Sequence, residues 1–243
     1  MNPTQKLSLS ETIGGKKFSL QTGTLAKQAG GSVTVHLEDT VLLTTATVAK
    51  NPRDVSFVPL TVEYRERTYA AGKIPGGFFK REARPREGEV LSARMTDRPI
   101  RPLFPKGWNY ETMVYSILIS MDGKNDAGPL SITGASAALL LSDAPITTPV
   151  AGVRIGRVNG EFVVFPTFEE RETSDLELVV AGKKGAILMV ECGAKEIPEE
   201  VLLQALEKAQ CVIDTLCDMQ LRLLAESEKS GRMVVKRQFS PPT

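Results

Sequence analysis

Alternating runs of β-branched residues fill the first third of the chain and constrain its fold more than any other feature. The runs 32–37 and 40–49 are separated by two acidic residues, which is the spacing of a tight hairpin. The runs 16–23 and 57–67 on either side show the same alternation. We therefore expect the first third to form a twisted, mostly antiparallel sheet.

A helical pattern replaces this alternation after Pro85. Two glutamates stand in its first turn, where they suit the positive end of the helix dipole. A strand at 112–120 and a second helix at 132–143 follow, and the small residues of that helix allow it to lie close to its neighbours. The first half is thus predicted to be sheet, helix, strand and helix.

The second half again places strands before a helix. Two prolines within 143–149 make this segment the best candidate for a joint. Beyond it, Asn159 and Gly160 form the strongest hairpin signal of the sequence, and 182–185 predicts another turn. After Pro198, apolar residues at helical spacing continue for the length of a long helix.

The whole pattern predicts a globular α/β (α+β) fold with a joint near residue 145 and a long C-terminal helix. With 243 residues, 42% of them hydrophobic, the chain is long enough to bury a substantial core. We expect a first subdomain at 1–145, a second at 146–230 and a tail at 231–243 that carries no packing signal.

The chain has no sequence signal for secretion or for a membrane. No apolar run approaches the length of a bilayer span, and the N-terminus lacks the apolar stretch of a secretory signal. We expect a cytoplasmic protein without a membrane partner. Cys192, Cys211 and Cys217 are odd in number and lack a CxxC spacing, which indicates neither disulfides nor zinc. We expect all three to be small buried residues.

Positive charge is concentrated in one part of the chain. The formal net charge is only +1, yet residues 65–106 contain eleven lysines and arginines against five acidic residues. The remainder is therefore net negative. A nearly neutral chain does not attract nucleic acid through its overall field, so any such binding must be local.

Paired phenylalanines and paired basic residues lie at the centre of this basic segment. Glycines and a proline within 72–77 predict a loop, with Phe78, Phe79, Lys80 and Arg81 at its tip. Exposed rings that stack on bases, beside cations that contact phosphates, are typical of single-stranded nucleic-acid binding. The composition alone equally allows the two rings to fill the core, and the nearby arginines favour nucleic acid.

Three further arginines follow at helical spacing. Arg94, Arg98 and Arg101 share one helix face if the helix continues through Pro99, and they lie on an extended segment if it stops near Asp97. In either geometry, three guanidinium groups suited to phosphate oxygens cluster together. The alternative is a solvated face on which these arginines pair with the acidic residues of the same helix.

The residues in this region resemble the first RNase PH-type module of the bacterial polynucleotide phosphorylase family. The resemblance covers nearly all of residues 5–230 and implies an α/β (α+β) fold of two β-α subdomains with mixed sheets. One departure is Lys80, where the family most often has arginine, so the bidentate contact with phosphate is lost there. The motifs that carry the resemblance are YRERTYAAGKIPGGFFKREARPREGEVLSARMTDRPIRPLFPKG, ITGASAALLLSDAPI, TPVAGVRIG and LELVVAGKKGAILMVE.

The resemblance implies a polyribonucleotide nucleotidyltransferase that degrades RNA from its 3′ end, with inorganic phosphate as co-substrate and Mg²⁺ as cofactor. It further implies single-stranded RNA as the ligand, a ring-like homotrimer with a central channel, and a role in mRNA degradation beside an endoribonuclease and a helicase. Family chains carry two such modules joined by a helical linker, to which the tail at 231–243 would lead. The RNA-binding residues carried over are Phe78, Phe79, Lys80, Arg81, Arg94, Arg98 and Arg101.

In the family, the catalytic centre belongs mainly to the second module, so we expect no catalytic residue here. Glu169 and Asp175, or Glu177, are candidate metal ligands from their place ahead of a VAG motif. The serine-rich phosphate loop is reduced to Ser131 and Thr133, and the single histidine, at position 36, is expected to be structural.

Three classes of function therefore stay open. The favoured one is an RNA-binding module that needs a second module for chemistry. The second is a self-sufficient enzyme of the RNase PH type. The third is a non-catalytic assembly module whose basic segment binds an acidic protein surface.

Overall fold

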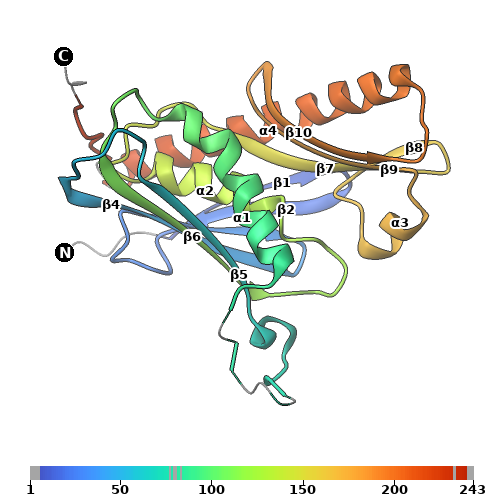
Figure 1. The fold of residues 1–243 in the computed structure, drawn as a ribbon, viewed down its shortest axis with the longest axis horizontal. Helices are drawn as coiled ribbons and strands as arrows, with labels where there is room; N and C mark the ends of the chain where they lie inside the picture. Colours follow the sequence, from blue (N-terminus) through green and yellow to red (C-terminus); the bar gives the residue numbers. More distant parts are fainter. Residues whose placement is uncertain (1–5, 77, 79–80, 83, 232–233, 240–243) are drawn as a thin grey trace.

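The computed structural model describes residues 6–76, 78, 81–82, 84–231 and 234–239, and Figure 1 shows its two sheets. The first sheet has the strand order β1-β2-β3-β4-β6-β5. Its neighbours are antiparallel except β5 and β6, which are parallel, so the sheet is mixed. The strands are β1 (Leu7–Ile13), β2 (Lys16–Thr22), β3 (Gly31–Leu37), β4 (Thr40–Pro52), β5 (Leu60–Glu66) and β6 (Tyr110–Ser120).

The second sheet has the order β10-β9-β7-β8, and all its pairs are antiparallel. The predicted hairpin joins β7 to β8 through Asn159 and Gly160. Their φ angles of 50° and 85° are both left-handed, as a two-residue hairpin of this kind requires. The strands are β7 (Ala151–Val158), β8 (Glu161–Val164), β9 (Leu176–Lys183) and β10 (Ala186–Ala194).

Helices pack against both sheets, and the predicted α/β (α+β) fold with a long C-terminal helix is confirmed. None of the helices in the described part of the chain is long and apolar enough to cross a membrane. Helix α1 continues through Pro99, which lies in its last turn. The helices are η1 (Thr68–Ala71), α1 (Glu87–Ile100), η2 (Arg101–Leu103), α2 (Leu130–Leu140), α3 (Phe168–Thr173) and α4 (Glu199–Lys229).

Helix α2 is buried along its whole length and lies very close to the first sheet. Two glycines permit this approach. A Cβ atom at Gly31 of β3 would lie 1.9 Å from the carbonyl oxygen of Ala138, and one at Gly134 would lie 2.6 Å from Oγ1 of Thr44. The small residues of the sequence motif therefore bring helix and strand backbones together.

Helix α4 joins the two halves of the molecule. It packs on β7 and β9 of the second sheet and also on β1 and β2 of the first. Phe18 of β2 stacks on Phe165 with a centroid distance of 6.1 Å, and both belong to the same buried cluster as Leu216 and Met219 of α4. One continuous core therefore extends across both sheets.

The prediction that all three cysteines are buried is wrong for two of them. Only Cys217 is buried, whereas Cys192 and Cys211 are exposed. Cys192 lies on β10, which is the edge strand of the second sheet. Cys211 is not among the buried residues of α4, so it lies outside the apolar face of that helix.

Residues 234–239 of the tail pack against the protein, although the sequence carries no packing signal there. The Nζ atom of Lys236 donates hydrogen bonds to the carbonyl oxygens of Leu139, Leu140 and Ser142, at 2.8–3.1 Å. These carbonyls belong to the C-terminal end of α2, which favours a cation. Burial lowers the pKa of Lys236 to about 8, so the side chain remains a cation at neutral pH.

Aromatic and ionic contacts continue this attachment. Arg237 forms an ion pair with Asp143 at 2.5 Å, and its backbone amide donates to the carbonyl of the same residue. The ring of Phe239 packs edge-on against Trp108 at 5.4 Å. The described part of the tail is therefore attached to the first sheet and its helix.

We expect Lys236→Met to detach this segment. The variant removes three hydrogen bonds from a charged donor, which costs about 1–3 kcal/mol, although the carbonyl of Leu139 keeps its bonds from Ser142. Hydrogen exchange of the Arg237 amide should accelerate, and exchange in β3 and β4 should not. Lys229→Met, at the exposed end of α4, is the control. Unchanged exchange at Arg237 would show that the lysine contacts do not hold the tail.

Candidate nucleic-acid interface

The segment between β5 and α1 carries the paired phenylalanines. Figure 1 shows this segment projecting beyond the end of the first sheet, while η1 itself contacts β6 through buried Ala70. Phe78 is 95% exposed and Ile74 is 91% exposed. Phe78 therefore does not fill the core, and most of its side chain faces solvent. Phe79 and Lys80 lie outside the described residues.

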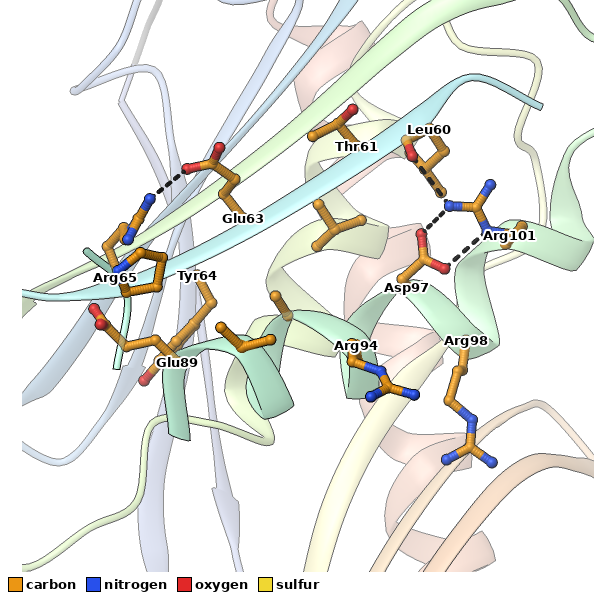
Figure 2. A pocket seen from close by; sticks show the side chains of 14 residues that line it. Leu60, Thr61, Glu63, Tyr64, Arg65, Glu89, Arg94, Asp97, Arg98 and Arg101 are labelled. Carbon is orange, nitrogen blue, oxygen red and sulfur yellow. Dashed lines mark hydrogen bonds and ion pairs between the residues drawn. The ribbon is translucent and has the colours of Figure 1, made fainter. Parts of the chain in front are cut away.

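A groove of about 590 Å³ runs between β5 and α1, beside the start of this segment. Figure 2 shows Arg94 and Arg98 one helical turn apart, both pointing to the same side of α1. Both side chains are exposed. The structure thus brings two of the three predicted arginines together on one face.

The two arginines differ in their partners. Arg98 forms an ion pair with Glu191 of β10 at 2.6 Å, with both side chains about half exposed. Such exposed pairs contribute little to stability, so this one leaves Arg98 open to competition by another anion. Arg94 has no hydrogen bond or ion pair with any residue that the structure describes.

Arg101 does not share this face. Its guanidinium group binds the carboxylate of Asp97 through two hydrogen bonds of 2.8 and 2.6 Å. It also donates to the carbonyl oxygens of Val58 and Leu60, at 2.9 and 3.0 Å. These contacts attach the start of β5 to the end of α1. They leave about one of the five N–H donors of an arginine for a phosphate.

The candidate metal ligands are engaged by arginines. Asp175 accepts a hydrogen bond from Arg157 at 2.6 Å, and Glu177 accepts from Arg171 at 2.8 Å. Hydrogen bonding to Arg171 lowers the pKa of Glu177. Glu169 is exposed on α3. Among the described residues, no cluster of three His, Cys, Asp or Glu side chains could hold a metal. These carboxylates do not fit a magnesium site, because cations already balance Asp175 and Glu177.

The hydroxyl groups expected near a phosphate site point into the protein. Ser131 donates to the carbonyl of Gly128 at 2.6 Å, and Thr133 accepts from the amide of Gly152 at 3.2 Å. His36 lies on β3 beside Thr34, and burial lowers its pKa. None of these three side chains faces the arginines of α1, so a separate phosphate site is not formed from them.

Sequence reasoning missed two groups of charged residues. Arg154 and Arg171 both approach Asp126, at 2.8 and 3.4 Å, behind a second groove between α1 and β10. Glu89 is 6% exposed and binds one backbone amide at each end of the loop segment. A glutamate in the first helical turn was a weak signal for Glu89, and the arginine network had none.

Comparison with known proteins places this geometry in a family. Residues 14–145 match the model of the 3′ exoribonuclease family, domain 1 (RNase PH), and residues 148–211 match domain 2 of the same family. The rice Rrp46 crystal structure superposes with a TM-score of 0.67 over 93% of this chain and 98% of that chain. At 14% sequence identity, that likeness concerns the fold alone.

Relatives with higher identity are polyribonucleotide nucleotidyltransferases. The protein of that name from Halalkalibacterium halodurans is 50% identical over 93% of this chain and 32% of its own length. The one from Endomicrobium trichonymphae is 51% identical over 89% of this chain, and the one from a Roseiflexus species is 47% identical over all of it. This chain spans about a third of the length of these relatives. With both family domains matched in order, the chain belongs to the 3′ exoribonuclease (RNase PH) family.

Proposed function

We propose that this chain is the N-terminal RNase PH-like module of a polyribonucleotide nucleotidyltransferase and binds single-stranded RNA during 3′-to-5′ phosphorolysis. The observation that carries the proposal is that Phe78 and Arg81 are exposed in the segment that leads into α1, on which Arg94 and Arg98 are exposed as well. Rings and guanidinium groups together bind a strand without reading its sequence. Phe79 and Lys80 belong to this proposal through the family resemblance alone.

In phosphorolysis, an oxygen of inorganic phosphate attacks the phosphorus of the last diester bond. The O3′ atom of the preceding nucleotide leaves, and a nucleoside diphosphate is released. The residues of this chain would hold the strand while the end is processed: Phe78 by stacking, and Arg94 and Arg98 by contact with diester oxygens. We assign no catalytic residue to this chain, since its hydroxyls and carboxylates are engaged elsewhere.

The phosphate site and any Mg²⁺ would then belong to the part of the longer relatives that this chain does not span. The ion would stabilise charge on the leaving oxygen. We also propose two subdomains at 1–145 and 146–230, with 231–243 leading to a helical linker. The support is that each sheet is formed within one of these segments.

Assembly follows as a further part of the proposal. A ring-like homotrimer would direct the segment between β5 and α1 from three copies toward one strand of RNA. The support for this part of the proposal is the family resemblance, together with the exposure of Phe78 in the segment that each copy would contribute. Partners in mRNA degradation, such as an endoribonuclease and a helicase, and a cytoplasmic location belong to the same proposal.

The test uses a 3′-labelled single-stranded RNA with and without inorganic phosphate. We expect this chain to bind the RNA and to release no nucleoside diphosphate. Release by the chain alone would overturn the proposal and favour the self-sufficient RNase PH-type enzyme. Binding that does not depend on RNA length or salt would instead favour the assembly module, because phosphate contacts release counterions.

We expect Arg98→Gln to reduce the salt dependence of RNA binding. Loss of one phosphate contact should lower the slope of log K against log salt by about 0.7 for a single strand. The matched control is Arg53→Gln. Arg53 is also exposed and also paired with a glutamate, Glu111, but it lies before β5 at the far end from the loop segment. Equal slopes for the two variants would exclude Arg98 as a phosphate contact.

A further inference from the structure

A single buried carboxylate binds both ends of the segment that carries Phe78. The backbone amide of Glu66, at the end of β5, donates to Oε1 of Glu89 at 2.7 Å. The backbone amide of Arg86, just before α1, donates to Oε2 of the same residue at 2.5 Å. The chain leaves β5 and returns to α1 at these two amides, so Glu89 closes residues 67–86 at their base.

Glu82 forms a second connection one step further out. Its Oε1 atom accepts from the amide of Thr68 at 2.8 Å, and its carbonyl oxygen accepts from Arg67 at 2.6 Å. Below Glu89, the hydroxyl of Tyr64 donates to Glu66 at 2.7 Å. The carboxylates of Glu89 and Glu82 thus connect the part of the segment that leaves β5 with the part that returns to α1, at two successive positions.

The chemistry of these contacts requires a carboxylate. An ionised carboxylate only accepts hydrogen bonds, and at Glu89 each oxygen faces an N–H group. A glutamine at this position would direct its NH₂ group against one of the two amides. The contact with Arg86 alone would be ordinary capping of a helix by its third residue. The contact with Glu66 reaches a different element and has no part in capping.

We propose that Glu89 is a positioning residue for RNA binding, which acts by fixing the ends of residues 67–86 and thereby the location of Phe78 and Arg81. This inference rests on the proposed function. Closing a segment at its base reduces the conformations available to its tip. The RNA therefore meets a ring and a guanidinium group that are already in place, and less ordering is needed on binding.

The direction in which RNA affinity changes on substitution of Glu89 distinguishes a positioning role from a purely electrostatic one. Glu89→Gln removes a negative charge close to a basic surface, which by itself would strengthen RNA binding. We expect affinity for a single-stranded RNA to fall about tenfold instead, as for one lost charge-assisted hydrogen bond. Glu87→Gln is the matched control, because it makes the same charge change in the same helix turn at an exposed position.

A double-mutant cycle tests whether Glu89 acts through the loop. RNA affinity is measured by fluorescence anisotropy for Glu89→Gln, Phe78→Ala and the double variant, with circular dichroism to verify folding. If Glu89 positions Phe78, its substitution costs much less when Phe78 is already alanine. Additive effects would overturn the inference, because a general loss of structure does not depend on Phe78.

Two further measurements distinguish a failure of the inference about Glu89 from a failure of the proposed function. Glu82→Gln breaks only the outer connection and serves in the same cycle if Glu89→Gln does not fold. Limited trypsin cleavage after Arg81 should be faster in both variants, and unchanged cleavage would contradict positioning. If Phe78→Ala itself leaves RNA affinity unchanged, the proposed function fails, whatever the cleavage rates are.

Discussion

Replacing Phe78 by alanine is expected to weaken binding of single-stranded RNA by about 1–3 kcal/mol, which is the range measured for one base stacked on an aromatic ring. Because 95% of the side chain is exposed, its loss removes little buried surface, and the free energy of unfolding should hardly change. Anisotropy titration with a labelled RNA measures the first quantity, and urea denaturation measures the second.

The control for this experiment is Phe57→Ala. Phe57 is also exposed, at 64%, but it precedes β5 and so lies at the opposite end of that strand from the loop segment. Its substitution should leave RNA affinity unchanged. If both variants bind RNA as the original chain does, stacking on Phe78 has no part in recognition.

Trp108→Ala is expected to have the largest effect on stability. The side chain is fully buried, contacts the rings of Phe104 and Tyr110, and donates through Nε1 to Oγ1 of Thr112 at 3.1 Å. Large-to-small changes of this kind cost about 3–5 kcal/mol. Urea denaturation gives the value. Circular dichroism follows the unfolding, because the variant lacks the only tryptophan of the chain and so has no tryptophan fluorescence.

Trp108→Phe serves as the partial replacement. It keeps an aromatic ring against its neighbours and loses the indole hydrogen bond, so its effect should be clearly smaller. The alanine variant should also release Phe239, which packs on Trp108. A cost below about 1 kcal/mol for Trp108→Ala would show that this cluster rearranges to fill the space.

Much of the fold could be predicted because its signals are local. The Asn159-Gly160 turn and the long helix after Pro198 depend on residues a few positions apart, and both form as expected. The bounds of α2 were predicted less accurately than its presence. The prediction placed this helix at 132–143, whereas it covers Leu130–Leu140.

The candidate site could be predicted less well, because partners far along the chain decide the role of each side chain. Arg94 and Arg101 are equally plausible phosphate ligands by sequence. Only the approach of β5 to α1 directs Arg101 to Val58 and Leu60, and leaves Arg94 exposed. Lys236 likewise shows no local pattern, since its partners lie about a hundred positions earlier.

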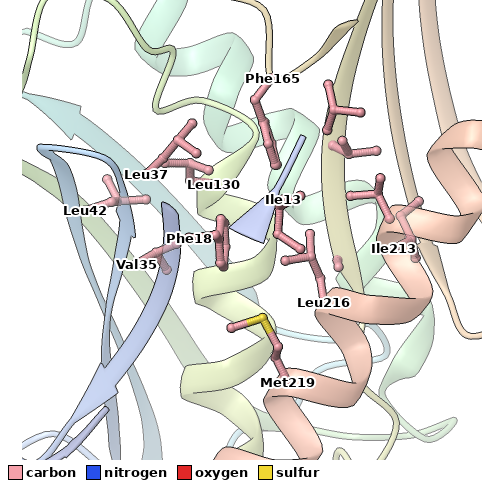
Figure 3. Close-up of a cluster of buried hydrophobic side chains, with 14 of the residues drawn as sticks. Ile13, Phe18, Val35, Leu37, Leu42, Leu130, Phe165, Ile213, Leu216 and Met219 are labelled. Atoms are coloured by element: carbon pink, nitrogen blue, oxygen red, sulfur yellow. The ribbon is translucent and has the colours of Figure 1, made fainter. Parts of the chain in front are cut away.

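The core shared between the first two strands and the last helix determines when this protein can fold during synthesis. Figure 3 shows Ile13 and Phe18 beside Leu216 and Met219 of α4. Contacts between residues so distant in sequence form slowly, because the whole intervening chain must be closed into a loop. A nascent chain would therefore expose the apolar residues of β1 and β2 that α4 covers until α4 has left the ribosome. Until then, this surface is open to chaperones and to aggregation.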